Sequence, residues 1–324
     1  LNSDQAVGNI YYPFEIDNTH KLVIDLDKFA LSFPEKTTQD TQASSLWPAM
    51  KISIESLSLD DALLGTFTLD AEQSSNKWTI ESAILKSGTY NVTVDSAEWL
   101  HTPQGDSTQV AFQIHSNNLG ETLSQLKFQR AIESKKVGLV AELEWNGAIM
   151  EYSRSLLNGY VGFTVDKGRL NDVDSGAGGR VLGLMSITAL PRRLSLDFSD
   201  LFAKGLSFDS INGSFDITDG IAETNDFLLK GPAAKVDISG KVDLGEQQYD
   251  QVVKITPNVS STLPWAGAIA GGPVGFGVGA AIVLADKLSD SLLGKNIVNI
   301  ISYKYSLSGP WENPEFKVLE STSP

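Results

Sequence analysis

Apolar and polar residues alternate along most of this chain. The alternating runs are Leu22–Leu26, Met50–Ile54, Gly65–Leu69, Tyr90–Val94, Val110–Ile114, Leu139–Trp145, Val161–Val165, Leu194–Phe198, Gly213–Ile217, Val236–Ile238, Val242–Leu244 and Tyr303–Leu307. This pattern is typical of strands with one dry and one wet face, because successive side chains point to opposite sides. The pairs Asp219-Gly220 and Lys167-Gly168 suit tight hairpins. The sequence predicts a mainly β fold, either a large one-sided curved sheet or a sandwich.

Two segments have a helical pattern instead. Between residues 119 and 126, leucines recur at helical spacing behind an N-cap at Asn117 or Asn118. From 178 to 189 the apolar residues point all round, which predicts a buried helix, and Pro191 would end it. We therefore expect a few helices beside the strands.

A third segment is apolar, uncharged and rich in glycine. No charged residue occurs from Ile255 to Ala285, and a Gly-Gly-Pro sequence lies in the middle of its most apolar part. The length suits a membrane span, but this centre would break a plain helix, so a helical hairpin over residues 265–293 is predicted. It is a candidate for contact with a membrane, or for a plug at the end of a trough, through Trp265, Ile269, Phe276, Ile282, Leu284, Leu288 and Leu292.

Composition narrows the function classes. The 324 residues carry a formal net charge of −15, so a nucleic-acid partner is not expected, because its phosphates would be repelled. The chain contains no cysteine, which excludes disulfides, thiol catalysis and zinc sites of the cysteine type. It starts at Leu1 without a methionine or a signal peptide, and we expect a mature product or an excised piece, in which any upstream anchor would not be visible.

Candidate catalytic groups are weak. Asp25 with Asp27, or Asp172 with Asp174, would be a carboxylate pair of the glycosidase type, but such residues normally form the solvated face of a strand. The histidines, His20, His101 and His115, are well separated and match no metal-binding motif. The glycines of residues 176–180 lack the Lys-Ser/Thr of a phosphate-binding loop. We expect no enzyme activity, no cofactor and no metal, and a carbohydrate-active enzyme is the third reading.

The apolar side of the strands has two interpretations. It is either the core of a closed sandwich or the lining of an open trough that receives acyl chains, and periodicity does not choose between them. The uncharged segment favours the trough, because such a surface is costly to leave in water.

Four ordered strings resemble a known family. These strings are DVDSGAGGRVLGLMSITALPRRLSLDF (172–198), SFDSINGSFDITDGIAETNDF (207–227), LKGPAAKVDISGKVDLGEQQYDQVVKITPNVSSTLP (229–264) and SGPWENP (308–314). They resemble the carboxyl-terminal region of the AsmA-like envelope proteins of the YhdP type, and they cover about the second half of the chain. The first half is similar in style, with strand-rich repeats. We accordingly divide the chain into a strand-rich groove segment, 1–166, and an AsmA-like carboxyl-terminal region, 167–324.

The resemblance implies a fold and a function. Members look like elongated, twisted β-sheet troughs with an open apolar groove, anchored in the inner membrane of Gram-negative bacteria by an amino-terminal helix absent from this chain. They span the periplasm and are implicated in moving phospholipid toward the outer membrane, without enzymatic chemistry or a cofactor. The implied partners are phospholipid, the outer membrane at the carboxyl-terminal end, and an envelope protein. The alternative is a structural or interaction module of the envelope with a closed sandwich core that docks on a partner protein.

Within the strongly matched block, one set of alternating residues is predicted to line the groove. It consists of Phe215, Ile217, Val236, Ile238, Val242, Leu244, Val253 and Ile255.

Overall fold

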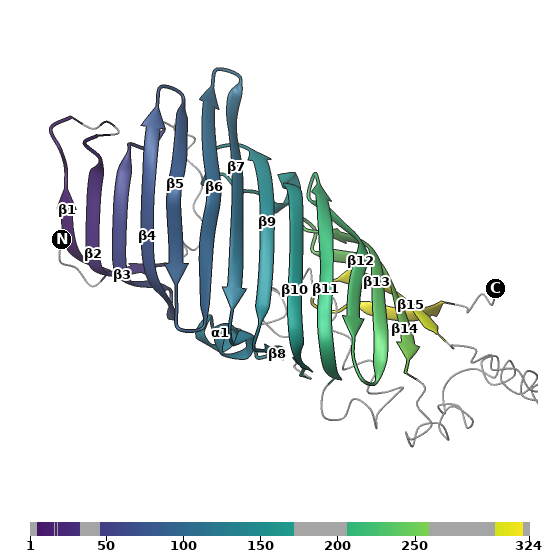
Figure 1. The fold of residues 1–324 in the computed structure, drawn as a ribbon. Helices are drawn as coiled ribbons and strands as arrows, with labels where there is room; N and C mark the ends of the chain where they lie inside the picture. Colours follow the sequence, from purple (N-terminus) through teal and green to yellow (C-terminus); the bar gives the residue numbers. More distant parts are fainter. Residues whose placement is uncertain are drawn as a thin grey trace, which may run out of the picture.

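The strands of this protein form one continuous sheet. The computed structural model describes residues 5–15, 17, 19–32, 46–171, 206–258 and 302–319. Within them, sixteen strands belong to a single sheet, in which all but β8 follow one another in chain order and β8 pairs with β10 (Figure 1). The sheet is open and twisted, and it is not closed into a barrel. The predicted mainly β fold is confirmed.

The strands are long for a globular protein, and most have ten or more residues, where five or six are usual. Their bounds are β1 Ala6–Tyr11, β2 Leu22–Leu31, β3 Met50–Leu59, β4 Ala62–Ser74, β5 Lys77–Lys86, β6 Tyr90–Thr102, β7 Gly105–Ser116, β8 Ile132–Ser134, β9 Val137–Asn146, β10 Asn158–Leu170, β11 Leu206–Thr218, β12 Ile221–Lys230, β13 Ala234–Asp243, β14 Gln248–Pro257, β15 Tyr303–Pro310 and β16 Glu315–Leu319. The helical elements are α1, Leu119–Gln125, and a 3₁₀ turn, Arg154–Leu156.

Neighbouring strands are antiparallel, as predicted, with one exception. β2 and β3 run parallel, with Leu22 opposite Met50. The predicted Asp219-Gly220 hairpin joins β11 to β12, and both residues have positive φ, 47° and 74°. Positive φ at both central positions is the signature of the type I′ turn, whose twist matches that of the flanking strands.

The second predicted hairpin, Lys167-Gly168, is wrong. Both residues lie inside β10, where Gly168 is paired with Ser134 of β8 on one side and with Phe208 of β11 on the other. A Cβ atom at Gly168 would lie 2.0 Å from the carbonyl oxygen of Glu133 and 2.6 Å from the Phe208 ring. The glycine is present because neighbouring chains approach closely there, and not because the chain turns.

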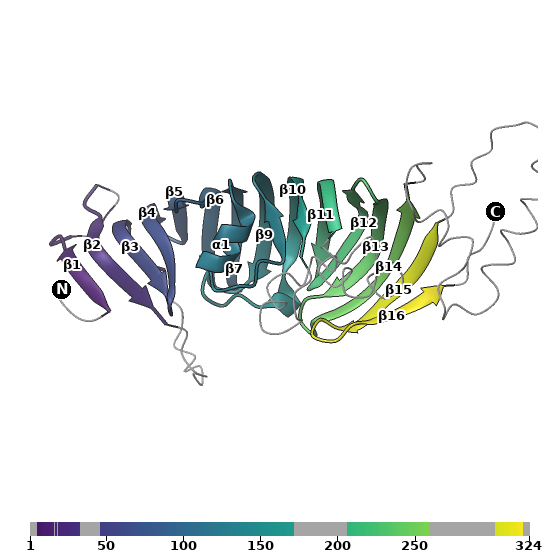
Figure 2. The same cartoon turned by 90° about the horizontal axis from the view of Figure 1, so that it is seen from below.

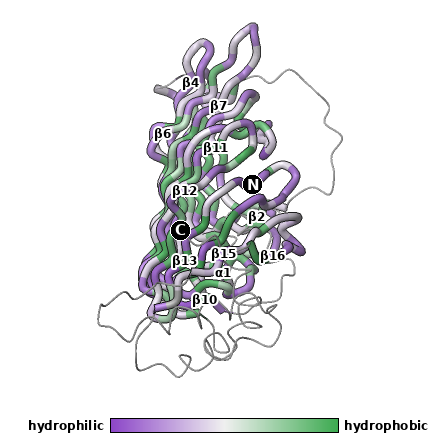
Figure 3. The backbone as a smooth tube through the Cα atoms, turned by 90° about the vertical axis from the view of Figure 1, so that its right-hand side faces the viewer, coloured by the Kyte–Doolittle hydropathy of each residue, from purple (hydrophilic) through white to green (hydrophobic). Residues whose placement is uncertain are grey.

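The sheet twists and curls along its length. Figure 2 shows the strands from β1 to β11 standing almost in line, whereas β12 to β16 turn progressively out of that line. Figure 3 looks along the row of strands and shows hydrophobic and hydrophilic residues alternating along them. Right-handed twist accumulates over many strands, and here it converts a nearly flat row into a curved sheet toward the carboxyl-terminal strands.

The predicted helix at 119–126 is confirmed as α1. Its N-cap is Asn118, whose side-chain oxygen accepts a hydrogen bond from the Glu121 N–H at 3.2 Å. Hydrogen bonds from Thr122 Oγ1 to Thr89 Oγ1 (3.0 Å) and from Ser87 Oγ to Gln125 Oε1 (3.0 Å) hold the helix against the β5–β6 turn. α1 therefore lies at one end of the strands, in the connection between β7 and β9.

Other predicted elements lie outside the described residues. These are the buried helix at 178–189, the strand run Leu194–Phe198 and the glycine-rich helical hairpin at 265–293. The predicted division between residues 166 and 167 falls inside β10, and the two segments share the one sheet. The division stays a prediction.

Candidate functional site

One face of the sheet is apolar from end to end. The strand register places one hydrophobic residue from each of eight consecutive strands of the sheet in a single row. That row is Leu26, Ile54, Phe67, Leu85, Val92, Ile114, Leu139 and Phe163. A second row beside it runs Ile52, Leu69, Ala83, Val94, Phe112, Ala141, Val161 and Phe215. We call this surface the apolar face.

All eight residues predicted to line a groove lie on the apolar face. Phe215, Ile217, Val236, Ile238, Val242, Leu244, Val253 and Ile255 belong to one cluster of buried side chains. The register joins them across strands, since Val236 is opposite Ile255 and Ile238 is opposite Val253. Each exposes 5% or less of its surface, so this part of the apolar face is packed as a core. The structure brings the predicted set together, and their role in lining a groove stays a prediction.

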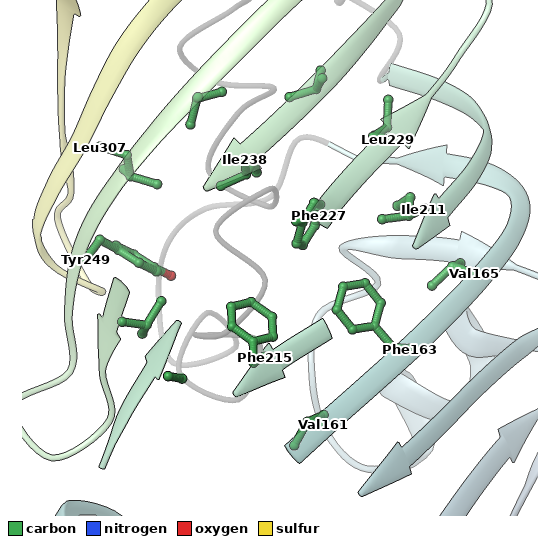
Figure 4. Close-up of a cluster of buried hydrophobic side chains, with 14 of the residues drawn as sticks. Val161, Phe163, Val165, Ile211, Phe215, Phe227, Leu229, Ile238, Tyr249 and Leu307 are labelled. Carbon is green, nitrogen blue, oxygen red and sulfur yellow. The ribbon is translucent and has the colours of Figure 1, made fainter. Parts of the chain in front are cut away.

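Three phenylalanine rings mark the middle of this cluster. Phe163 of β10, Phe215 of β11 and Phe227 of β12 point into the same space (Figure 4). The Phe163 ring centroid lies 5.3 Å from that of Phe227 and 6.2 Å from that of Phe215. Gly213 faces Phe163, and a Cβ atom there would lie 3.0 Å from the ring. The missing side chain makes room for the aromatic ring.

The central strands carry the same face in a more open form. On β6, β7 and β9 a set of its hydrophobic side chains is half-buried, whereas Ala97, Trp99, Ala141 and Trp145 are buried. The half-buried set is Val92, Val94, Val110, Phe112, Ile114, Leu139 and Leu143. Sequence reasoning recognised their alternation but did not select them as lining residues. Their period-two spacing could have identified them, because it is as regular as that of the eight residues predicted to line the groove.

The opposite face of the sheet is polar and charged. Its ion pairs include Lys235 with Asp237 (2.7 Å) and Lys77 with Glu98 (3.1 Å), and these side chains are 38–46% exposed. Exposed pairs of this kind contribute little to stability. These charges make the two faces of the sheet different, because the charged face is hydrated and the other face is left to apolar groups.

Tryptophans line the rim opposite α1. Trp78 and Trp99 are paired across β5 and β6, and Trp47 packs edge-on against both, with ring centroids 5.2 and 5.9 Å away. Three indole N–H groups near this edge have carbonyl or carboxylate partners. Trp78 donates to the Pro48 carbonyl (3.1 Å), Trp99 to Asp106 Oδ2 (2.8 Å) and Trp145 to the Ala148 carbonyl (3.0 Å). We call this edge, which carries the β4–β5, β6–β7, β9–β10, β11–β12, β13–β14 and β15–β16 connections, the turn rim.

The buried section of the apolar face contains few polar groups. Thr224 and Gln251 are both at most 2% exposed. Within the described ranges, neither the nitrogen nor the oxygen of the Gln251 carboxamide has a hydrogen-bond partner. Burial raises the pKa of the Tyr249 hydroxyl and that of Tyr303, because an ionised phenolate is disfavoured away from water. These tyrosines stay neutral at physiological pH, so the apolar face has no charge from them.

The candidate catalytic groups have structural partners. His101 Nδ1 lies 2.6 Å from Asp106 Oδ1, on a carboxylate that also accepts from Trp99, and His20 Nδ1 lies 3.2 Å from Asp17. Asp25 and Asp27 are exposed. Among the described residues, no three or more histidine, cysteine, aspartate or glutamate side chains are placed to hold a metal ion. Asp172, Asp174 and residues 176–180 lie outside them.

The predicted membrane-contact residues lie outside the described part of the chain. They are Trp265, Ile269, Phe276, Ile282, Leu284, Leu288 and Leu292. In the part that is described, helices are too short or too polar to cross a membrane.

An open sheet with one apolar and one polar face defines a class of large amphipathic β-sheet proteins, and comparisons with known proteins identify the family within it. The model of the YhdP protein family matches residues 1–316, and the chain belongs to that family. The resemblance predicted from the second half of the sequence is confirmed, and it extends through the first half.

A curated relative is the "Intermembrane phospholipid transporter YhdP" of Escherichia coli (strain K12). It is 28% identical over 269 residues, which are 83% of this chain and 21% of the relative. The chain thus spans about a fifth of that protein's length. No solved structure matches this chain.

Proposed function

We propose that this chain is a lipid-conducting segment of an envelope protein that moves phospholipid between the inner and outer membranes of a Gram-negative cell. The acyl chains travel along the apolar face, and the head groups stay on the solvent side. The observation that carries this proposal is the continuity of the apolar rows over eight neighbouring strands. The E. coli relative, named an intermembrane phospholipid transporter, supports the same function.

The energetics favour such a path. Exposing two acyl tails of about 15 methylenes each to water costs about 0.8 kcal/mol per methylene, or roughly 24 kcal/mol in all. A surface of valine, isoleucine, leucine and phenylalanine removes most of that penalty, because the tails pass from one hydrocarbon environment to another. Many equivalent apolar positions share the task, so no single side chain is indispensable and the direction of flow is not encoded.

The proposed location follows from the proposed task. The chain works in the periplasm, within a longer protein held in the inner membrane by an amino-terminal helix, and its carboxyl-terminal end faces the outer membrane. An envelope protein partner at that end belongs to the proposal. Neither a catalytic step nor a cofactor is needed, because the lipid is moved without being changed.

The test is transfer of a fluorescent phospholipid between donor and acceptor vesicles. Ile114→Glu places a charge on the half-buried part of the apolar face, and His115→Glu, one residue along β7, places the same charge on the polar face. We expect Ile114→Glu to lower the transfer rate at least about ten-fold, because desolvating a carboxylate beside an acyl chain is costly. His115→Glu should transfer lipid like wild type. Equal rates for the two variants would contradict the proposal.

The alternative of an interaction module makes a different structural demand. It requires two sheets packed face to face, and the described residues form a single sheet instead. A folded, lipid-free chain that binds an envelope partner through the apolar face remains the outcome that would replace lipid transport.

A further inference from the structure

A pocket opens at the turn rim, where the trough is curled most strongly. Its volume is about 630 Å³, within the usual range for small-molecule sites. Its walls are formed by the β9–β10 connection and β10 on one side and by the turns after β13 and β15 on the other. We call it the rim pocket, and its lining includes Tyr152, Arg154, Leu157, Leu244, Trp311 and Glu312.

Backbone hydrogen bonds hold these distant segments side by side. The Gly220 N–H donates to the Leu157 carbonyl (2.9 Å), and the Leu244 N–H donates to the Gly220 carbonyl (2.9 Å). The Trp311 N–H donates to the Gln247 carbonyl (2.9 Å). The rim pocket is therefore a feature of packed turns and is not a gap between independent loops.

The interior of the rim pocket is continuous with the apolar face. Leu143, Val161, Ile217 and Leu244 line it, and Ile217 and Leu244 belong to the residues predicted to contact acyl chains. The rim pocket and the apolar face therefore share part of their apolar lining.

Two donors in the rim pocket have no hydrogen-bond or ion-pair partner among the described residues. The indole nitrogen of Trp311 is buried and has no partner in that part of the chain, although its ring lies 6.2 Å from that of Tyr249. The guanidinium of Arg154 is exposed and forms no ion pair with any described residue. A buried donor without a partner calls for an explanation such as a ligand, and a guanidinium is a strong phosphate binder.

The connection that carries Arg154 also carries exposed apolar side chains. Met150, Tyr152 and Leu156, on the same connection as Arg154, expose 76%, 51% and 53% of their surfaces. Exposed apolar side chains around a cation suit a group with a charged head and hydrocarbon behind it, whereas free phosphate would gain nothing from them. The lining also contains one carboxylate, that of Glu312. Its negative charge balances the positive charge of Arg154, so the rim pocket has no net charge to attract small anions.

We propose that the rim pocket is a lateral portal that binds the phosphate-bearing head of a phospholipid while its tails lie on the apolar face. Arg154 contacts the phosphate, and the Trp311 indole N–H donates to a phosphate or ester oxygen. Lipid enters or leaves the trough sideways at this point. The inference rests on the proposed function, since it concerns the same lipid.

Photocrosslinking in the full chain tests the portal. Benzoylphenylalanine replaces Tyr152 at the portal, Phe112 on the apolar face, or Tyr160 on the polar face, and the protein is irradiated with vesicles of radiolabelled phosphatidylethanolamine and phosphatidylglycerol. We expect lipid adducts at positions 152 and 112 and none at 160. Arg154→Gln should lower the adduct at 152 about ten-fold, the loss of one charge-assisted hydrogen bond, without lowering that at 112. Trp311→Phe, which keeps a ring and removes the donor, should also lower it.

Arg169→Gln is the matched control, because Arg169 is an exposed cation on the polar face of β10. Adducts at 112 but not at 152, or adducts at 152 that Arg154→Gln leaves unchanged, would overturn the portal and keep the trough. No adducts at either position would overturn the proposed function itself. Inorganic phosphate that abolishes the adduct at 152 would identify a phosphate site and contradict a lipid portal.

Discussion

The central strands and the carboxyl-terminal strands share one apolar face but use it differently. From β6 to β9 most valine, leucine and isoleucine side chains of this face are half-buried, although Ala97, Trp99, Ala141 and Trp145 are buried. From β10 to β15 most positions of the face are buried at 8% exposure or less. Residue types and strand register are similar in both regions, so alternation alone does not decide burial. The curl of the sheet differs, and it brings the walls of the carboxyl-terminal section toward one another (Figure 2). The same pattern therefore makes an open surface in one region and a core in the other.

The largest expected difference in stability between the two regions comes from introducing a charge on the apolar face. Ile238 is 2% exposed, so Ile238→Glu buries a carboxylate without a partner and should lower the free energy of unfolding by more than about 4 kcal/mol. Ile114→Glu, on the half-buried section, should cost less than about 2 kcal/mol because its carboxylate reaches water. Denaturant unfolding followed by circular dichroism measures both. Equal losses would show that the two regions are packed alike.

A smaller contrast comes from truncating aromatic rings. Phe227 packs against Phe163 inside the cluster, and Phe227→Ala should lower the free energy of unfolding by about 3–5 kcal/mol. Phe112→Ala should lower it by about 1–2 kcal/mol, because the Phe112 ring is only half-buried in the folded protein and its removal loses less buried apolar surface. Parallel urea titrations of the two variants give the difference. A larger loss at Phe112 would reverse the assignment of core and open surface.

Replacing the buried Gln251 carboxamide, which has no partner among the described residues, should stabilise the protein, unlike the two changes above. Gln251→Leu removes two buried polar atoms without partners and should raise the free energy of unfolding by about 1–3 kcal/mol. Gln113→Leu, on the polar face of the central section, serves as the control: its carboxamide has a partner in Asp95 Oδ2 (3.0 Å), so the change should not raise the free energy of unfolding. A destabilised Gln251→Leu protein would mean that the carboxamide has a bound partner in solution.

The smallest effect is a dependence of stability on pH. Burial raises the pKa of Tyr249, whereas unfolded tyrosines ionise near pH 10. Below pH 10 both states keep the proton and stability does not change through this group. Above pH 10 the unfolded state loses its proton first, so the free energy of unfolding should fall by about 1.4 kcal/mol per pH unit for this tyrosine. Tyr249→Phe should remove that part of the slope, and an unchanged slope would place the hydroxyl in water.

Much of the architecture was predictable from the sequence, and the reasons are local. Period-two alternation identifies strands because it follows from backbone geometry, and α1 is specified by its leucine spacing and Asn118. Lys167-Gly168 misled because a glycine that permits close approach of neighbouring strands looks like a glycine in a turn. The β2–β3 parallel pair could not be predicted, since relative strand direction depends on the path of the connecting chain.

The candidate site was predictable only in part. The eight predicted residues share a face, because a fixed register joins equivalent positions of neighbouring strands. Their near-complete burial was not predictable, since it depends on how far the sheet curls. The rim pocket was also inaccessible to sequence reasoning, because Arg154 and Trp311 are 157 positions apart and meet only through packed turns.

The most direct test of the central claim is organic extraction of the purified, detergent-free chain, followed by lipid mass spectrometry. The account predicts stoichiometric phospholipid in wild type and in His115→Glu, and at least about a ten-fold loss in Ile114→Glu, because only that variant charges the open section of the apolar face. A folded, monodisperse wild-type chain without lipid, or full lipid occupancy in Ile114→Glu, would contradict it.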